Sequence, residues 1–372
     1  MPEPTRNVLF LADRPGEHDD GWPIGMFLDR LAKLGISGQV LCVTRPAGAG
    51  ADSRVMEANG LRNRWVRPLA VRRLGFGEGL KRPDLIHAID AEMGPAALSI
   101  AETWEVPYLL TAREFLPEGG WLRLSKRWCR GLIAASRDLA EDLVVNLKVP
   151  ADFLSVVSRG VAVADEPTVA ARPGKVPVIG TAGALVPSSG MATFLNAARR
   201  VTDTGVDAEF VIAGHGEDEY DLRRRAARLK IADRVTFTNR SLLGLRFWSV
   251  LDLFCQMSLI PTVGRTLAIA QSFGVPALAS DVEGLRALVA HEANGVLVPP
   301  GDSTALAHAI LDLLANPERA RRLGARGREA VRRDLNPEAE AESLAAVYRQ
   351  VLDEGAFRPA VAARAVEAVA LQ

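Results

Sequence analysis

The sequence predicts an α/β protein made of two doubly wound domains. The chain has 372 residues, more than a single hydrophobic core ordinarily serves. In both halves short apolar runs alternate with amphipathic stretches, which is typical of parallel strands joined by helical crossovers. Between the halves, Ala162–Pro177 is rich in Ala, Pro and charge without a clear period and is interpreted as a linker. We therefore place an N-terminal domain at 1–165 and a C-terminal domain at 175–335.

The N-terminal half contains apolar runs of strand length, with helix-like segments between several of them. The predicted strands are Val8–Ala12, Gln39–Val43, Leu85–Ala88, Tyr108–Thr111, Leu132–Ala135 and Ser155–Val157. The predicted helices include Gly25–Leu34, Pro95–Trp104 and Arg137–Leu147.

The C-terminal half repeats this scheme and ends in helices. Its predicted strands are Val178–Thr181, Glu209–Ala213, Val235–Thr238, Leu251–Cys255, Ala277–Ala279 and Gly295–Val298. The closing helices are predicted at Ala305–Ala315, Pro317–Arg332 and Pro337–Leu352. In such folds a ligand is expected at the carboxyl ends of the strands, in a cleft between the two domains.

Composition narrows the class of protein. The 45 basic and 45 acidic side chains balance, which argues against nucleic acid as a partner. The cysteines Cys42, Cys129 and Cys255 lie far apart and match no metal or disulfide spacing, so no metal site is expected. The N-terminus resembles no signal peptide, and no apolar run reaches the length of a membrane span. A cytoplasmic protein is expected.

Glycine-containing turns follow three predicted strands of the second half. They are Gly183 to Gly190, Gly214–His215–Gly216 and Gly264–Arg265–Thr266. Ser188 and Ser189 are expected to cap the helix that follows Gly190. Helix N-termini that meet at one sheet edge bind anions through backbone N–H groups. These turns therefore predict a site for a small anionic ligand.

The same pieces carry a resemblance to a known family. In order, the chain has IGTAGALVPSSG, FVIAGHGEDEYDLRRRA, DRVTFTNR, DLFCQMSLIPTVGRTLAIAQSFGVPALASDVEG and NGVLVPPGDSTALAHAILDLLANPERARRLG. From about Val178 to Leu352 it resembles the nucleotide-sugar domain of retaining glycosyltransferases of family four, the group 1 transferases with the GT-B fold. The first half matches more loosely, through PDLIHAID, VPYLLTAREF and GLIAASRDLAEDL.

The resemblance implies a class of donor substrate and a different binding role for each half of the chain. The donor would be a nucleotide sugar, such as a UDP- or GDP-sugar, bound as substrate without a metal or other cofactor. The first half would bind the acceptor, a polysaccharide precursor or a lipid-linked sugar. The last helix, about 337–352, is expected to pack back on the first domain.

The resemblance also assigns donor-binding residues, all in or beside the glycine turns. These are Gly183, Ser188, Ser189, Gly190, Gly214, His215, Gly216, Arg240, Gly264, Arg265 and Thr266. For two of them an ordinary role stays open: Arg265 as a solvated residue at a helix start, and His215 as a loop cap. Arg240 would lie beside the base-binding loop.

At four positions the chain departs from the family pattern. Ala184 stands where the family has Arg, and Ser189 where it has Lys. Pro261 and Ile269 replace the two glutamates that hold the sugar and the ribose. Because isoleucine accepts no hydrogen bond, a donor bound in the usual way would leave buried hydroxyls unpaired, at roughly 1–3 kcal/mol each.

No catalytic residue is evident, and only two candidates remain. Asp19 lies in the loop Gly16–Gly21 after the first strand, where it could contact the acceptor or simply cap a helix. Arg113 stands where the family often has histidine. An arginine stays protonated and cannot be a general base, but it can bind a phosphate on an acceptor.

A basic, aromatic segment suggests a second kind of contact. A helix is predicted over Trp121–Arg130, with Arg123, Lys126, Arg127 and Arg130 on one face beside a tryptophan stripe. This pattern suits an interfacial helix at an anionic membrane, and Arg54–Arg82 adds eight basic residues against two acids. The alternative interpretation is a solvated face over buried tryptophans. Peripheral contact with the inner membrane face is therefore left open.

Two hypotheses about function follow. The chain transfers a sugar through an altered donor site, in cell-surface polysaccharide or glycolipid assembly. Alternatively, it is an inactive pseudo-glycosyltransferase that serves as a partner, scaffold or regulatory subunit, and then a protein partner is expected. An epimerase-like activity would need the same nucleotide contacts that the four departures remove.

Overall fold

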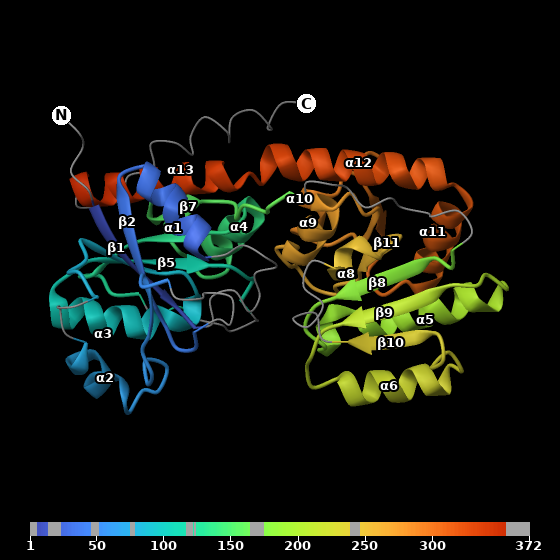
Figure 1. The fold of residues 1–372 in the computed structure, drawn as a ribbon, viewed down its shortest axis with the longest axis horizontal. Helices are drawn as coiled ribbons and strands as arrows, with labels where there is room; N and C mark the ends of the chain where they lie inside the picture. The colour runs from blue at the N-terminus through green and yellow to red at the C-terminus, as the bar shows by residue number, and fades with distance from the viewer. Residues whose placement is uncertain are drawn as a thin grey trace. The chain divides into compact units, whose positions relative to one another are not determined.

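The computed structural model describes residues 6–13, 24–45, 52–74, 79–116, 122, 124–163, 175–238 and 246–354. The chain divides into two compact units, each with its own parallel sheet (Figure 1). Unit 1 is Met1–Gly160 together with Pro337–Gln372, and unit 2 is Val161–Asn336.

Unit 1 is a seven-stranded sheet in the order β3-β2-β1-β4-β5-β6-β7. Its strands are β1 Arg6–Ala12, β2 Ile36–Cys42, β3 Val55–Glu57, β4 Leu85–Ala88, β5 Tyr108–Ala112, β6 Cys129–Ala134 and β7 Leu154–Val156. Its helices are α1 Ile24–Lys33, α2 Arg67–Arg73, α3 Gly94–Trp104, α4 Arg137–Val145 and α13 Pro337–Glu354, with short 3₁₀ turns at Ala91–Met93 and Ala151–Phe153. The strand order reverses between β1 and β4, the place where ligands bind in open parallel sheets.

The last helix, α13, completes the core of unit 1. Tyr348 of α13 is buried and packs edge-on against Phe10 of β1, which also contacts Phe27 of α1. At its start α13 is tied to α1 by Glu338, which lies 2.7 Å from Arg30. Residues far apart in the chain therefore share one apolar cluster.

Unit 2 is a six-stranded sheet in the order β10-β9-β8-β11-β12-β13. Its strands are β8 Val178–Ala182, β9 Glu209–Ala213, β10 Val235–Thr238, β11 Leu253–Gln256, β12 Ala277–Ser280 and β13 Val296–Val298. Its helices are α5 Met191–Asp203, α6 Glu219–Arg228, α8 Arg246–Ser249, α9 Arg265–Ser272, α10 Leu285–Leu288, α11 Ser303–Ala315 and α12 Pro317–Asp334, with a 3₁₀ turn at Pro187–Ser189.

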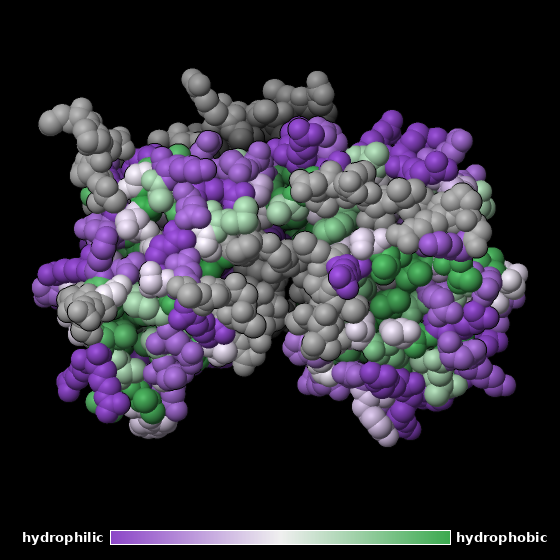
Figure 2. Space-filling model, in the orientation of Figure 1, coloured by the Kyte–Doolittle hydropathy of each residue, from purple (hydrophilic) through white to green (hydrophobic). Residues whose placement is uncertain are grey.

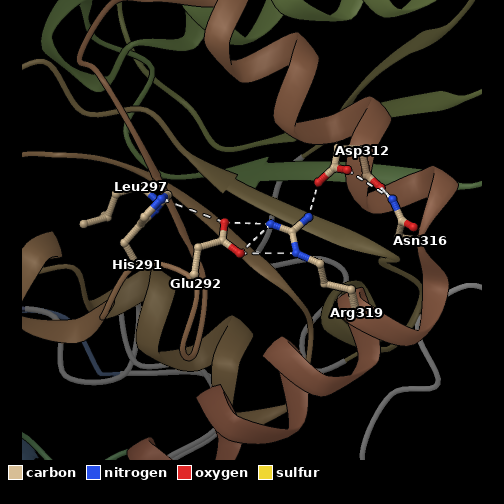
Figure 3. Close-up of polar contacts among 6 residues, drawn as sticks. All are labelled: His291, Glu292, Leu297, Asp312, Asn316 and Arg319. Carbon is tan, nitrogen blue, oxygen red and sulfur yellow. Dashed lines mark hydrogen bonds and ion pairs between the residues drawn. The ribbon is translucent and has the colours of Figure 1, made fainter.

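A network of ion pairs connects helices α11 and α12 with the turn before β13 in unit 2. Arg319 of α12 pairs with Glu292 at 2.6 Å and also with Asp312 of α11 (Figure 3). His291 accepts a hydrogen bond from the backbone of Leu297 at 3.0 Å, which shapes the turn that presents Glu292. The turn before β13 is thus joined to both closing helices of the unit.

The strands predicted from the sequence are all present, with bounds that differ by at most three residues. Among the short elements that were not predicted are the edge strand β3 and the helices α2, α8 and α10. Within the described part of the chain, no helix is long and apolar enough to cross a membrane.

The helix predicted over Trp121–Arg130 is wrong for the residues that the structure describes. Lys126–Trp128 form a turn, and Cys129 and Arg130 begin strand β6. The carbonyl of Trp128 accepts a hydrogen bond from the backbone of Tyr108 at 2.9 Å. Pairing with the neighbouring strand β5 therefore overrides the helical period.

Candidate functional site

The loops that follow β8, β9 and β11 are bonded to one another. Gly183 donates to the carbonyl of Ala213 at 3.0 Å, and Leu185 donates to that of His215 at 2.9 Å. Leu259, after β11, donates to the carbonyl of Ser188 at 2.8 Å. The predicted glycine turns after β8 and β9 and the start of the loop after β11 therefore adjoin one another at the carboxyl edge of the unit 2 sheet.

Two glycines make this close packing possible. Gly190 has φ 70°, and a Cβ there would overlap the carbonyl oxygen of Met257. A Cβ at Gly214 would overlap the carbonyl oxygen of Gly183. Only glycine allows backbones to approach this closely, so these positions hold the loops in register.

Helices α5 and α9 both begin at this edge. Gly190 is the N-cap of α5, and Gly264 is the N-cap of α9. The prediction that the serines cap α5 is wrong, because neither serine is its N-cap and the hydroxyl of Ser189 donates to the carbonyl of Ala184. Ser188 is half-buried in the 3₁₀ turn before α5.

The remaining predicted donor-site residues lie around these helix starts. Arg265 and Thr266 are half-buried in the first turn of α9, and His215 and Gly216 are exposed in the loop before α6. Arg240 lies outside the described residues. The structure brings the described members together at one edge of one sheet.

Ile269 lies inside the apolar core of unit 2. It is 2% exposed and belongs to the cluster that contains Trp248, Phe273 and Leu285. Pro261, in contrast, is exposed in the loop before α9, as is Ala184 after β8. Of the two positions where the family pattern has glutamate, one is therefore enclosed by hydrocarbon and the other faces solvent.

Unit 1 has a small cavity, of about 60 Å³, at the carboxyl edge of its own sheet. Four lining residues each come directly after a strand, β4 to β7: these are Ile89, Arg113, Ala135 and Val157. Helices α1 and α13 supply the opposite wall. The polar lining is His87, Thr111, Arg113, Arg159 and Glu340.

The charged groups of this cavity are fixed by neighbours. Arg113 pairs with Asp90 at 2.9 Å, and Glu340 accepts a hydrogen bond from the backbone of Gly160 at 2.7 Å. Arg113 was predicted from the sequence as a candidate, whereas Arg159 and Glu340 were not. Asp19, the other candidate, lies outside the described residues.

His87 lines the cavity and is 2% exposed. Its Nδ1 is 2.7 Å from the hydroxyl of Tyr348, and its Nε2 is 2.7 Å from that of Thr111. Burial, assisted by the charge of Arg113, lowers the pKa of His87 to about 3. The imidazole is therefore neutral near pH 7, and it joins α13 to β5.

The basic segment predicted to contact a membrane is only partly described. Trp121 and Arg123 lie outside the described residues. Lys126 and Arg127 are exposed, Arg130 is half-buried, and the Arg127 guanidinium lies 4.9 Å from the ring centre of Trp128. The charges are on the surface, but they are carried by a turn.

Comparison with known proteins points to one family. Residues 164–330 match the model of the family "Glycosyl transferases group 1". The chain is similar to alpha-D-kanosaminyltransferase of Streptomyces kanamyceticus, with 26% identity over 47% of this chain and 46% of that protein. It is also similar to phosphatidyl-myo-inositol mannosyltransferase of Mycobacterium leprae, with 31% identity over 45% of each chain. In these matches the chain spans less than half the length of either relative.

Similarity of fold extends over nearly the whole chain. The structure of Anabaena Alr3699/HepE in complex with UDP and glucose superposes with a TM-score of 0.72 at 17% identity. The superposition covers 92% of this chain and 99% of that one. The chain therefore has the GT-B fold, and its residues 164–330 match the group 1 glycosyltransferase family.

Proposed function

We propose that this chain transfers a sugar from a nucleotide-sugar donor to a polysaccharide or lipid-linked acceptor through an altered donor site. The observation that carries the proposal is the bonded set of loops after β8, β9 and β11. Gly190 and Gly214 keep these loops close, and two helices begin there. Backbone N–H groups at helix starts can hold a diphosphate without the two cations that the chain lacks.

Arg265 is the cation best located to assist in this role. It is the first residue of α9, beside the N-cap Gly264. A guanidinium there would form charge-assisted hydrogen bonds to phosphate oxygens. His215 and Thr266 are expected to add contacts to phosphate or sugar from the neighbouring turns.

The unit 1 cavity is the proposed place for part of the acceptor. Arg159 and the Asp90-paired Arg113 would bind an anionic group there beside Glu340, and the apolar wall includes Phe27 and Leu344. Neither arginine can act as a base, so transfer would depend on positioning and on electrostatic stabilisation of the leaving diphosphate.

Calorimetry with UDP, GDP, ADP and their sugars tests the donor site directly. We expect one nucleotide to bind with a Kd on the order of micromolar. Arg265→Gln should weaken this binding about tenfold or more, because charge-assisted bonds to phosphate are lost. Arg322→Gln is the matched control, since Arg322 is an exposed arginine of α12 in the same unit. Equal weakening in both variants, or none in either, would contradict the role of Arg265.

A second function is favoured by the position of Ile269. Its enclosure at 2% exposure leaves no acceptor for ribose hydroxyls at that point of α9. The chain would then be an inactive pseudo-glycosyltransferase that acts as a partner, scaffold or regulatory subunit. If calorimetry detects no binding of any nucleotide or nucleotide sugar, the result would support this function over sugar transfer.

A further inference from the structure

Helix α2 and the turn before it present apolar side chains to solvent. Trp65 is 79% exposed, Leu69 51% and Val66 44%. The only buried residue of the helix is Val71, on the side that faces α3. Since Leu69 and Val71 are two positions apart, they lie on nearly opposite sides of the helix. The outward face is therefore the apolar one.

Exposed arginines lie beside these apolar side chains. Residues 58–74 contain five arginines and no acid, although the whole chain has no net charge. Arg64, Arg72 and Arg73 are exposed, and the Arg64 guanidinium lies 4.4 Å from the ring centre of Trp65. We call Arg64, Trp65, Val66, Leu69, Arg72 and Arg73 the α2 surface. In Figure 2 strongly hydrophilic and hydrophobic residues lie side by side over α2.

The turn that carries Trp65 is well fixed. The backbone of Trp65 donates to the side chain of Asn63 at 2.9 Å. Arg67 donates to the carbonyls of Leu61 at 2.6 Å and Arg62 at 3.0 Å. The backbone that presents Trp65 is thus ordered before the tryptophan contacts a partner, which lowers the entropy cost of binding.

We propose that the α2 surface docks unit 1 on an anionic phospholipid membrane. Trp65, Val66 and Leu69 would enter the interface between headgroups and acyl chains, and the arginines beside them would contact lipid phosphates. An aromatic and aliphatic face flanked by arginines matches such a surface in both polarity and charge. Membrane docking here goes beyond the proposed transfer reaction, because it does not depend on a donor or an acceptor.

Co-sedimentation of the full chain with lipid vesicles tests the proposal. Binding is expected to phosphatidylcholine vesicles that contain phosphatidylglycerol, and to be much weaker on phosphatidylcholine alone. Trp65→Ser with Leu69→Ser should lower the partition coefficient about tenfold or more. Arg72→Glu with Arg73→Glu should do the same at low salt, with a smaller effect as salt screens the charges.

Matched controls come from unit 2. Tyr220 is 70% exposed and has the Arg224 guanidinium 5.6 Å from its ring centre, so Tyr220→Ser mimics the loss of Trp65. Arg321→Glu with Arg322→Glu reverses an adjacent exposed pair on α12. Both controls should bind vesicles as the unchanged chain does.

A labelled variant separates docking from loss of fold. Cys42, Cys129 and Cys255 are all buried, so Leu69→Cys offers a selective site for a polarity-sensitive thiol dye. Its emission should shift to the blue on anionic vesicles, whereas the same dye on Tyr220→Cys should not shift. The proposal is overturned if the chain does not bind the vesicles, or if the α2 variants bind them as well as the unchanged chain does. It is also overturned if the control variants lose as much binding as the α2 variants. Self-association without lipid that Trp65→Ser with Leu69→Ser abolishes would also overturn it, in favour of a second copy of the chain.

Discussion

At the scale of the residue, Ile269 is the most informative side chain of unit 2. It occupies a position where the resembled family has a ribose-binding glutamate, yet it is 2% exposed within an apolar cluster. A carboxylate in such surroundings must either be paired or lose its charge. An isoleucine at this position therefore suits the apolar packing around α9.

Ile269→Glu is therefore expected to destabilise the chain by roughly 2–5 kcal/mol at neutral pH, measured by denaturant unfolding. Burial raises the pKa of the new carboxyl, so the deficit should shrink as pH falls toward 4 and grow as pH rises. Ile269→Leu, which conserves volume, should change stability by less than about 1.5 kcal/mol. Pro261→Glu, at an exposed position, should stay within about 0.5 kcal/mol.

Unchanged stability of Ile269→Glu would contradict this view of the site. It would mean that the position opens to solvent or to a ligand. Pro261→Glu with Ile269→Glu could then restore affinity for a nucleotide sugar, and calorimetry on that double variant would show it.

At the scale of the element, the docking of α13 depends on one neutral histidine. His87 bonds Tyr348 of α13 and Thr111 of β5, and burial holds its pKa at about 3. In the unfolded chain the pKa of histidine is near 6.5. Folding stability from this group is thus complete above about pH 6.5 and is lost as pH falls toward the folded value.

Lowering the pH should therefore weaken the packing of α13, because His87 must stay neutral in the folded chain. Between pH 6.5 and 4.5 the unfolding free energy should fall about 1.4 kcal/mol per pH unit more steeply than in His87→Gln. The variant should be less stable at pH 7, because the tyrosine and threonine hydroxyls lose an ideal partner. Parallel pH profiles for the two chains, followed by circular dichroism in denaturant, would show that His87 does not carry the effect.

How closely an element could be predicted depended on how clear its sequence pattern is. β1, β4 and β9 were predicted closely because each is a mostly apolar run bounded by polar or turn residues. Helix α2 was missed because RPLAVRR buries only Val71 and so has no amphipathic period. The segment before β6 has a helical spacing of charges, but the carbonyl of Trp128 accepts a hydrogen bond from the backbone of Tyr108 of β5, a contact distant in the sequence.

Some residues of the candidate site could be located from the sequence, and others could not. Gly190, Gly214 and Gly264 could be located because each follows a strand and precedes a helix. The burial of Ile269 could not be predicted, since it depends on residues of several elements around α9. Glu340 enters the unit 1 cavity from the far end of the chain, and no local pattern connects it with Arg113.

At the scale of the whole molecule, the chain leaves unit 1 and returns to it at one place. Gly160 lies against Pro337, and its backbone is bonded to Glu340 at 2.7 Å. The backbone of Val161 donates to the carbonyl of Leu335 at 2.8 Å. Unit 2 is thus inserted into unit 1 between two adjoining points.

A chain that ends at Asn336 should lose the folded structure of unit 1 and keep that of unit 2. Without α13 the apolar cluster around Phe10 loses one wall, whereas the core of unit 2 keeps all its members. Limited proteolysis should digest residues 1–160 rapidly and leave a resistant fragment near 161–336. A chain that ends at Glu354 is the control and should resist in both units. Equal resistance of residues 1–160 in the two chains would show that α13 is dispensable.

The insertion also sets the order in which the protein can fold as it is made. Synthesis runs from the N-terminus at about 5–20 residues per second. The first 160 residues therefore leave the ribosome on the order of ten seconds before α13 does. Throughout that interval the face of β1 that will receive Tyr348 stays uncovered, while unit 2 can already close. The inserted unit has the first chance to become native, and the unit that begins the chain is completed last.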